Sequence, residues 1–249
     1  MAGEGQRFRR AGIDTPKPLI DVGGVPMYQL VLSNLWSKHV GRITLIAREE
    51  FGIEAFAGPI GERLGLEVNV VSVRHTTGGP ADSVGLAQPF LNQDEAVVVA
   101  NSDQFVDAPI DDFYYELLGS DVSGAILTME DDDEKWSYVE IDSHGHVIRV
   151  AEKEVISRYA TVGIYGFRTA EVMLSAFASM RKAGDKVSNE YYVGPAYNYL
   201  ERSSGPVVIS HLGPVGRVMY GLGVPDDLER FKSFGPKGPV ERARLLFLQ

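Results

Sequence analysis

The sequence contains no cysteine in its 249 residues. Disulfide-stabilised scaffolds, thiolate metal sites and cysteine nucleophiles are therefore excluded. No apolar run approaches the roughly 20 residues that span a bilayer. The polar, basic first residues are also not followed by the apolar stretch of a signal peptide. We therefore expect a cytoplasmic protein that does not bind a membrane.

Positive charge is scarce as well. Lys and Arg total 24 against 34 Asp and Glu, which gives a net charge of -10. This balance argues against nucleic acid or an anionic membrane surface as a partner, because both attract basic proteins. Any basic patch for an anionic ligand must therefore be local.

The first half of the sequence alternates between short β-branched runs and stretches with helical spacing. Expected strands cover 43–47, 66–73 and 95–103, and expected helices cover 25–39, 48–65 and 80–92. This alternation predicts parallel β-α-β units in a doubly wound, mostly parallel sheet of the Rossmann-like α/β class.

The second half predicts an antiparallel extension, because its expected strands follow one another through short connections. These strands cover 122–129, 136–142, 146–152 and 160–167, and helical patterns return at 169–184, 189–203 and 225–234. The sequence shows no internal repeat or flexible linker, so its length favours a single domain over residues 1–249.

The opening segment AGEGQRF combines glycines with positive charge. Gly3 and Gly5 allow backbone N–H groups to approach a ligand closely, and Arg7, Arg9 and Arg10 follow at once. This combination suits a polyphosphate, although it is neither a dinucleotide fingerprint nor a Walker loop. A basic tail without a catalytic role is the alternative.

Two further residues are candidates for phosphate chemistry. Lys17 stands between two prolines, which stiffen the backbone and present its ammonium as a positioned charge; a solvated proline turn is the alternative. Asp103 follows the apolar run VVVA, at the carboxyl end of an expected strand, where open α/β sheets bind ligands. Its carboxylate is a natural Mg²⁺ ligand, or else it caps the next turn.

Three other features favour structural roles. The acidic run at 130–134 lacks the spacing of a calcium loop and is typical of a solvated turn. His144 and His146 lie at an expected hairpin tip without a further ligand nearby in sequence. The aromatic residues of NEYYVGPAYNYL recur at helical spacing, which favours core packing.

Eight sequence blocks together resemble the sugar-phosphate nucleotidyltransferase family, also called the sugar nucleotide pyrophosphorylase family. In order they are AGEGQRF, TPKPLIDVGGVPM, TTGGPADSV, VVVANSDQ, AEKE, ATVGIYGF, NEYYVGPAYNYL and GLGVPDDLERF. The resemblance covers almost the whole chain. It is strongest to short enzymes encoded beside bacterial capsule and surface-polysaccharide genes, several of which use CTP.

The resemblance implies a role for each matching residue. Residues 1–120 would form the nucleotide-binding half and residues 121–249 the acceptor-binding half. The catalytic residues would be Arg7, Lys17 and Asp103, with Asp103 also holding Mg²⁺. The nucleotide would lie against Gly3, Glu4, Gly5, Gln6, Arg7, Thr77, Gly78, Gly79, Ala81 and Ser102. The acceptor would lie against Glu152, Lys153, Gly163, Asn189 and Glu190.

The implied reaction joins an NTP to a sugar phosphate or a similar phosphorylated precursor and releases pyrophosphate. CTP is favoured, with dTTP and UTP as alternatives, and a homo-oligomer is left open. A phosphomonoester acceptor has a second pKa of about 6, so near neutrality it can attack without a general base. A metal-dependent glycosyltransferase and a non-catalytic nucleotide or nucleotide-sugar binding protein are the rival hypotheses.

The sequence departs from the family pattern at three places. Gln6 stands where relatives have Ser or Thr, and Gly221 stands where many have a second metal-binding carboxylate, with Asp226 nearby. The family's glycine loop also normally follows an apolar central strand, whereas the sequence as printed begins at the loop. We therefore expect either a start codon assigned too late or a missing central strand.

Overall fold

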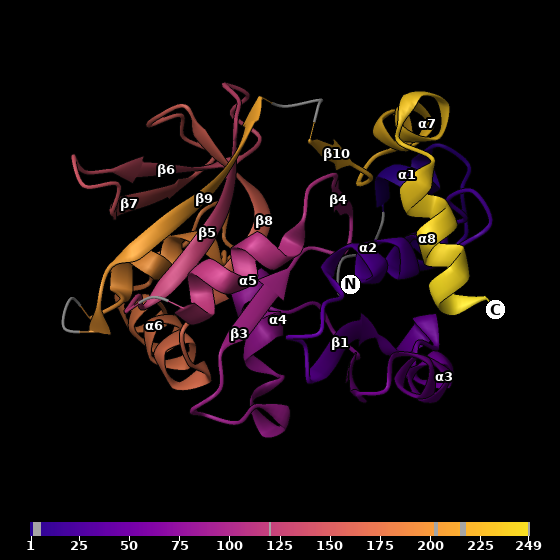
Figure 1. The fold of residues 1–249 in the computed structure, drawn as a ribbon, viewed down its shortest axis with the longest axis horizontal. Coiled ribbons are helices and arrows are strands. Elements are labelled where there is room, and N and C mark those ends of the chain that lie inside the picture. The colour runs from indigo at the N-terminus through magenta and orange to yellow at the C-terminus, as the bar shows by residue number, and fades with distance from the viewer. Residues whose placement is uncertain (2–5, 120, 202–203, 215–217, 249) are drawn as a thin grey trace. The chain divides into compact units, whose positions relative to one another are not determined.

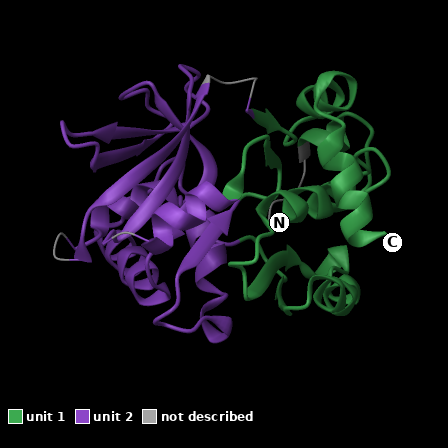
Figure 2. Ribbon diagram, in the orientation of Figure 1, with its two compact units in different colours: residues 1–76, 101–110, 219–249 green, residues 77–100, 111–218 purple. Residues whose placement is uncertain are grey.

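The chain forms two compact units in the computed structural model, which describes residues 1, 6–119, 121–201, 204–214 and 218–248 (Figure 2). Unit 1 comprises residues 1–76, 101–110 and 219–249, and unit 2 comprises residues 77–100 and 111–218. Each unit has its own hydrophobic core. The functional division of the chain near residue 120 stays a prediction.

Unit 1 is built from three separate chain segments (Figure 1). Its helices are α1 (Gln6–Arg10), α2 (Met27–Leu35), α3 (Glu54–Leu64), α7 (Pro225–Phe234) and α8 (Gly238–Phe247), with short 3₁₀ turns η1 (Lys17–Leu19) and η2 (Glu49–Phe51). Its strands are β1 (Arg42–Arg48), β2 (Glu67–Val73), β4 (Gln104–Val106) and β10 (Met219–Gly221).

The predicted parallel β-α-β unit is present in unit 1. Strands β1 and β2 pair in parallel over seven residues, from Arg42 opposite Glu67 to Arg48 opposite Val73, and α3 connects them. The connection ends at Gly65, whose φ of 67° lies in the left-handed region that favours glycine. This local pattern is therefore one that the sequence predicted correctly.

Helix α2 contributes to both hydrophobic clusters that make up the core of unit 1. Eight of its nine residues are buried, and three of these eight are polar. Met27 and Leu30 pack in the cluster that contains Phe105 and Phe231. Tyr28 packs instead in the cluster built on β1 and α3. Because α2 contributes to both clusters, it holds the three chain segments of unit 1 together.

Unit 2 contains a six-stranded sheet and the helices that pack with it. Its strands are β3 (Val97–Ala100), β5 (Gly124–Glu130), β6 (Ser137–Ile141), β7 (Val147–Glu152), β8 (Tyr159–Phe167) and β9 (Val207–Pro214). Its helices are α4 (Pro80–Gly85), α5 (Ile110–Gly119, whose first residue belongs to unit 1) and α6 (Ala170–Ala183), with 3₁₀ segments η3 (Gln88–Phe90) and η4 (Gly194–Tyr199).

Strand β8 is the centre of that sheet. The sheet runs in the order β7-β6-β8-β5-β9, and β3 also pairs with β8. Strand β5 pairs in parallel with β9, whereas β3, β5 and β6 all pair with β8 in antiparallel fashion. The predicted α/β class and the antiparallel extension in the second half are therefore confirmed.

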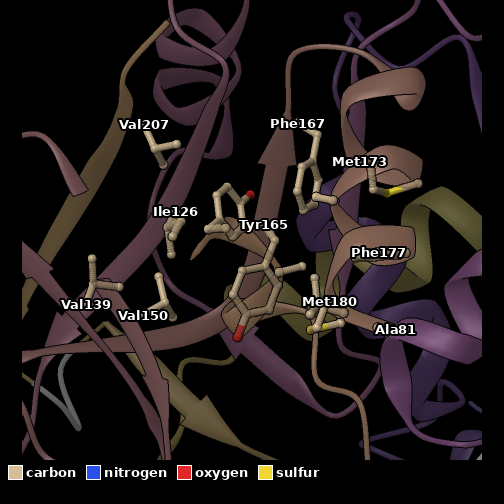
Figure 3. Close-up of a cluster of buried hydrophobic side chains, with 14 residues drawn as sticks. Ala81, Ile126, Val139, Val150, Tyr165, Phe167, Met173, Phe177, Met180 and Val207 are labelled. Carbon is tan, nitrogen blue, oxygen red and sulfur yellow. The ribbon is translucent and has the colours of Figure 1, made fainter. Parts of the chain in front are cut away.

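Helix α6 covers the core of unit 2. Thr169 caps its start by accepting a hydrogen bond from the Val172 N–H at 3.1 Å, and Gly184 ends it with a φ of 69°. Met173, Phe177 and Met180 recur at helical spacing and pack with Phe167 of β8 (Figure 3). The apolar face that the sequence pattern predicts for α6 is therefore the face that packs against the sheet of unit 2.

One predicted helix is wrong. The pattern at 189–203 predicts a helix, but among the described residues of this range, 189–201, only Gly194–Tyr199 is helical, as a 3₁₀ segment. Ser188 and Asn189 have φ values of 49° and 67°, so a tight turn precedes it, and Gly194 and Pro195 start the short helix. The sequence also did not predict strands β4, β9 and β10 or helices α5 and α8.

No helix among the described residues is both long and apolar enough to cross a membrane.

Candidate active site

Unit 1 brings together two of the predicted catalytic residues, Lys17 and Asp103. Lys17 begins η1 between Pro16 and the buried Pro18, and Asp103 lies in the turn between β3 and β4 with the partly buried Ser102. The Lys17 Nζ lies 2.5 Å from Oδ2 of Asp103, and both side chains are about three-quarters buried, with 24% and 28% exposed. A charged pair with this limited exposure is suited to holding a metal-bound polyphosphate.

The Lys17–Asp103 pair depends on a glycine from the third segment of unit 1. A β-carbon at Gly223 would lie 2.7 Å from Oδ2 of Asp103 and 3.4 Å from Nζ of Lys17. The neighbouring Leu222 donates its N–H to the Asp103 carbonyl at 2.7 Å. The segment after β10 therefore both fixes the backbone of Asp103 and leaves room for its side chain.

Strand β4, which follows Asp103, is held on helix α2 by Asn34. The Asn34 amide donates to the Val106 carbonyl at 2.6 Å and accepts from the Val106 N–H at 2.8 Å. Asn34 is buried, so these bonds satisfy two backbone groups that have little access to water. The Asn34 side chain thus makes the two backbone hydrogen bonds that a neighbouring strand would otherwise make to Val106.

The glycine-rich opening lies mostly outside the described residues. Gly3, Glu4 and Gly5 are not described, and Gln6 is the first residue of α1. Arg7 is exposed on this helix, while the next residue, Phe8, is buried in the core of unit 1. Phe8 therefore anchors the helix that carries the predicted phosphate-binding arginine.

The predicted nucleotide-binding loop of unit 2, residues 77–81, is held by short-range hydrogen bonds. The Thr77 hydroxyl donates to the Gly79 carbonyl at 3.1 Å and lies 2.7 Å from the Ser83 hydroxyl. Gly79 has a φ of 129°, and a β-carbon there would lie 2.5 Å and 2.6 Å from the backbone N and O of Tyr191. Only glycine fits this close approach of two backbone segments.

The same loop is joined to the NEYY segment through the backbone. The Tyr191 N–H donates to the Gly78 carbonyl at 2.8 Å, and the Ala81 N–H donates to the Tyr191 carbonyl at 2.9 Å. The side chain of Asp82 also pairs with Arg181 of α6 at 2.5 Å. The predicted nucleotide-binding and acceptor-binding segments of unit 2 are therefore direct neighbours.

A charged cluster joins three of the predicted acceptor-binding residues. Lys153 donates from Nζ to the Tyr192 hydroxyl at 2.7 Å, and that hydroxyl donates to Oε2 of Glu190 at 2.8 Å. Glu152 accepts a hydrogen bond from the Ser137 hydroxyl. Sequence reasoning missed Tyr192, because its aromatic neighbours have the spacing of a core helix. That interpretation is correct for Tyr197, which is buried.

The cluster changes the proton affinity of its members. Burial raises the pKa of Glu152 above its ordinary value, although the Ser137 hydrogen bond and the positive charge of Lys153 oppose this rise; the negative charge of Glu190 adds to it. Partial burial lowers the pKa of Lys153, but the hydrogen bond from Lys153 to Tyr192 and the charges of Glu152 and Glu190 outweigh it, so the pKa rises. The cluster therefore favours a protonated lysine beside a carboxyl group that resists ionisation.

Gly163 and Asn189 have clear backbone roles. Gly163 has a φ of 72° where the register between β5 and β8 shifts, so it occupies a β-bulge. Asn189 occupies the tight turn between Val187 and Glu190, whose N–H and carbonyl groups exchange two 3.0 Å hydrogen bonds. Asn tolerates the left-handed conformation well, which explains its presence there.

The donor set near Asp103 suits Mg²⁺ bound mainly by substrate. No group of three or more His, Asp or Glu residues that could hold a metal occurs among the described residues. Mg²⁺ typically takes one or two protein carboxylates and completes its shell with water and phosphate oxygens. Asp103 fits that role. A β-carbon at Gly221 would lie 3.0 Å from Oδ2 of Asp227, so the carboxylate nearest that glycine is Asp227.

Several solved structures share this fold. A nucleoside-diphosphate-sugar pyrophosphorylase from Vibrio cholerae RC9 matches with a TM-score of 0.80 and 22% identity, over 94% of this chain and 98% of that one. A Bacillus anthracis protein assigned as a glucose-1-phosphate thymidylyltransferase has a TM-score of 0.75 at 22% identity, over 94% and 92%. The inositol-1-phosphate CTP transferase of T. maritima has a TM-score of 0.73 at 17% identity, over 98% and 93%.

The sequence comparisons give the family. No curated protein sequence matches this chain. The family model described as "Nucleotidyl transferase" matches residues 1–192, which include the paired Lys17 and Asp103 and the cluster around Lys153. The chain therefore belongs to the nucleotidyl transferase family, and it is a nucleotidyltransferase with the α/β fold of that family.

Proposed function

We propose that this enzyme transfers a nucleotidyl group from an NTP to a sugar phosphate or similar phosphorylated precursor for surface-polysaccharide biosynthesis. CTP is the favoured nucleotide, with dTTP and UTP as the alternatives. The observation that carries the proposal is the 2.5 Å pair of Lys17 and Asp103, which joins residues 86 positions apart in a family of nucleotidyltransferases.

In the proposed reaction an oxygen of the acceptor phosphate attacks the α-phosphorus of the NTP. The new P–O bond forms as the bond from the α-phosphorus to the bridging oxygen breaks, and pyrophosphate leaves with that electron pair. The acceptor phosphate is largely dianionic near neutrality, because its second pKa is about 6, so no general base is required. The enzyme has to align two anions that repel each other and to neutralise their charge.

The residues of unit 1 suit that task. Lys17, held by the two prolines, is proposed to neutralise the α-phosphate and the incoming phosphate, and Arg7 the β- and γ-phosphates. Asp103 would hold Mg²⁺, which when bound supplies positive charge to the phosphate oxygens and the leaving pyrophosphate. The Lys17–Asp103 pair also keeps both side chains oriented before substrate binds.

The residues of unit 2 suit substrate recognition. We assign Thr77, Gly78, Gly79 and Ala81 to the base and ribose, and Glu152, Lys153, Gly163, Asn189 and Glu190 to the acceptor. The rigid backbone bonds between Gly78, Ala81 and Tyr191 support a preorganised surface for both substrates. The structural neighbours bear the names of a thymidylyltransferase and a CTP transferase, so they are compatible with either nucleotide.

The test is pyrophosphate release from a panel of NTPs with several sugar 1-phosphates. We expect release that depends on both substrates, is fastest with CTP, and falls about a hundredfold or more in Lys17→Ala. Lys232→Ala is the matched control, because Lys232 pairs with Glu229 on the exposed side of α7 in the same unit. The control should keep wild-type activity.

Two results would replace the proposal by its rivals. Hexose transfer from a nucleotide sugar, without pyrophosphate release from any NTP, would identify a glycosyltransferase. Nucleotide binding without turnover in any combination would identify a binding protein. Release with UTP or dTTP alone would keep the reaction class and correct the nucleotide.

A further inference from the structure

Lys153 has a backbone conformation that its surroundings must maintain. It follows directly after β7, with a φ of 58°, which is uncommon for a residue that carries a β-carbon. Such conformations persist only where neighbouring contacts hold them, and they concentrate at ligand-binding sites. The Lys153 N–H donates to the Trp136 carbonyl at 3.0 Å, which fixes the backbone at this point.

The side chain of Lys153 is held by Tyr192. Its Nζ donates to the Tyr192 hydroxyl at 2.7 Å and lies 4.7 Å from the centre of the Tyr192 ring. The ring and the hydroxyl therefore both attract the same ammonium group. A lysine on a strained, exposed backbone position would otherwise sample many rotamers.

Tyr192 is itself held from two sides. Its hydroxyl donates to Glu190 at 2.8 Å, and Glu190 closes the tight turn with Val187 through two backbone hydrogen bonds. The preceding residue, Tyr191, is bonded through its N–H to the Gly78 carbonyl. The phenol therefore extends from a backbone segment that has little freedom to move.

From this arrangement we infer that Tyr192 is a positioning residue, which holds the ammonium of Lys153 where it meets the phosphate of the acceptor. The inference rests on the proposed function, because it takes that acceptor to be a phosphomonoester. Tyr192 does not contact the reacting atoms in this scheme. It acts through Lys153, while Glu190 fixes the direction of the phenol and Glu152 adds a further acidic group beside the lysine.

The test is Tyr192→Phe, which keeps the ring and removes the hydroxyl. We expect the KM for the acceptor to rise about tenfold, with kcat and the KM for the NTP within about twofold, because a hydrogen bond to a charged group is lost. In the Lys153→Ala background the same substitution should have no further effect on the acceptor KM, since Tyr192 acts through Lys153. Independent, additive effects would overturn the inference.

A second measurement does not depend on turnover. The NMR signal of the Lys153 side chain is titrated with inorganic phosphate, and Tyr192→Phe should weaken the apparent affinity about tenfold. The matched control is Tyr199→Phe, which removes another phenol–carboxylate hydrogen bond of unit 2, to Asp185 at 3.0 Å. Equal phosphate affinity in the Tyr192→Phe and Tyr199→Phe variants would overturn the inference.

Failure of the proposed function and failure of the inference about Tyr192 would give different results. If the wild-type protein releases no pyrophosphate with any substrate pair, the proposed function fails. The phosphate titration still decides whether Tyr192 positions Lys153 for a phosphate.

Discussion

At the scale of single residues, the candidate site requires two glycines, because neighbouring groups lie where a β-carbon would be. Gly79 and Gly223 both lie where a β-carbon would meet another group closer than 3.0 Å. At Gly79 the neighbour is the backbone of Tyr191, which cannot move without disturbing the loop. At Gly223 the neighbour is the carboxylate of Asp103, which can move. A β-carbon at this position would therefore disturb the candidate site and not the fold.

Gly223→Ala should therefore lower activity and leave the stability of the fold nearly unchanged. The new methyl group would displace the Asp103 carboxylate from Lys17, and we expect pyrophosphate release to fall at least about tenfold. The free energy of unfolding should change by less than about 1 kcal/mol, because only a flexible side chain has to move. Urea denaturation alongside the activity assay checks both values. Wild-type activity would show that the pair tolerates displacement.

Glu152 should make stability depend on pH. Its pKa is raised in the folded protein, so the folded state binds this proton more tightly than the unfolded state, and stability falls as pH rises above the ordinary carboxyl pKa. Glu152→Gln removes that loss. We expect a higher Tm than wild type at neutral pH and a difference that shrinks as the pH is lowered toward the ordinary carboxyl pKa.

Differential scanning calorimetry across the acidic to neutral range measures this dependence. Glu62→Gln, on the exposed surface of α3, controls for the loss of one negative charge. A Tm difference for Glu152→Gln that is constant with pH would contradict the assigned shift.

At the scale of elements, asparagine side chains fasten strands to helical segments in both units. Asn34 of α2 makes two hydrogen bonds to the backbone of Val106 on β4. Asn198 of η4 makes the same two bonds to Val150 on β7, each at 2.8 Å. A carboxamide can donate and accept at once, so it satisfies both backbone groups of one residue. An aspartate of the same shape cannot.

Asn34→Asp should therefore destabilise unit 1. The carboxylate can accept from the Val106 N–H, but it would face the Val106 carbonyl without a proton to donate, inside a buried site. We expect a loss of about 3 kcal/mol in the free energy of unfolding, measured by urea denaturation. Asn198→Asp is the matched comparison and should cost less, because Asn198 is more exposed. Equal losses would contradict the role of burial.

At the scale of the whole molecule, the chain crosses between its two units several times, and yet each unit has a separate core. The core of unit 1 combines Phe8 from the first segment, Phe105 from the second and Phe231 from the third. The core of unit 2 is built around β8 and α6. Stability can therefore be lost locally in one unit.

Phe231→Ala tests that expectation. Deleting this buried ring should cost about 3–5 kcal/mol. Because Phe231 packs with Phe105 and Tyr220 of unit 1, hydrogen exchange should accelerate mainly in residues 1–76, 101–110 and 219–249. Equal acceleration in the strands of unit 2 would show that the molecule unfolds as one cooperative unit.

The sequence by itself determined the elements whose signals are local. The β-branched runs, the spacing of Met173, Phe177 and Met180, and the prolines around Lys17 act within a few residues, so a single stretch is enough to predict them. The blocks of the family likewise singled out Lys17 and Asp103. Those residues were predictable as candidates, and their roles in the reaction stay predictions.

Only the tertiary structure decided which of these residues meet. The pairing of Lys17 with Asp103, the room left by Gly223 and the bonds of Asn34 join positions from separate segments of unit 1. Tyr192 has the spacing of a core residue, but it lies beside Lys153 because a left-handed turn replaces the predicted helix. Contacts between distant positions depend on how the whole chain folds. Short-range sequence patterns report only local structure, so they do not specify which distant positions meet.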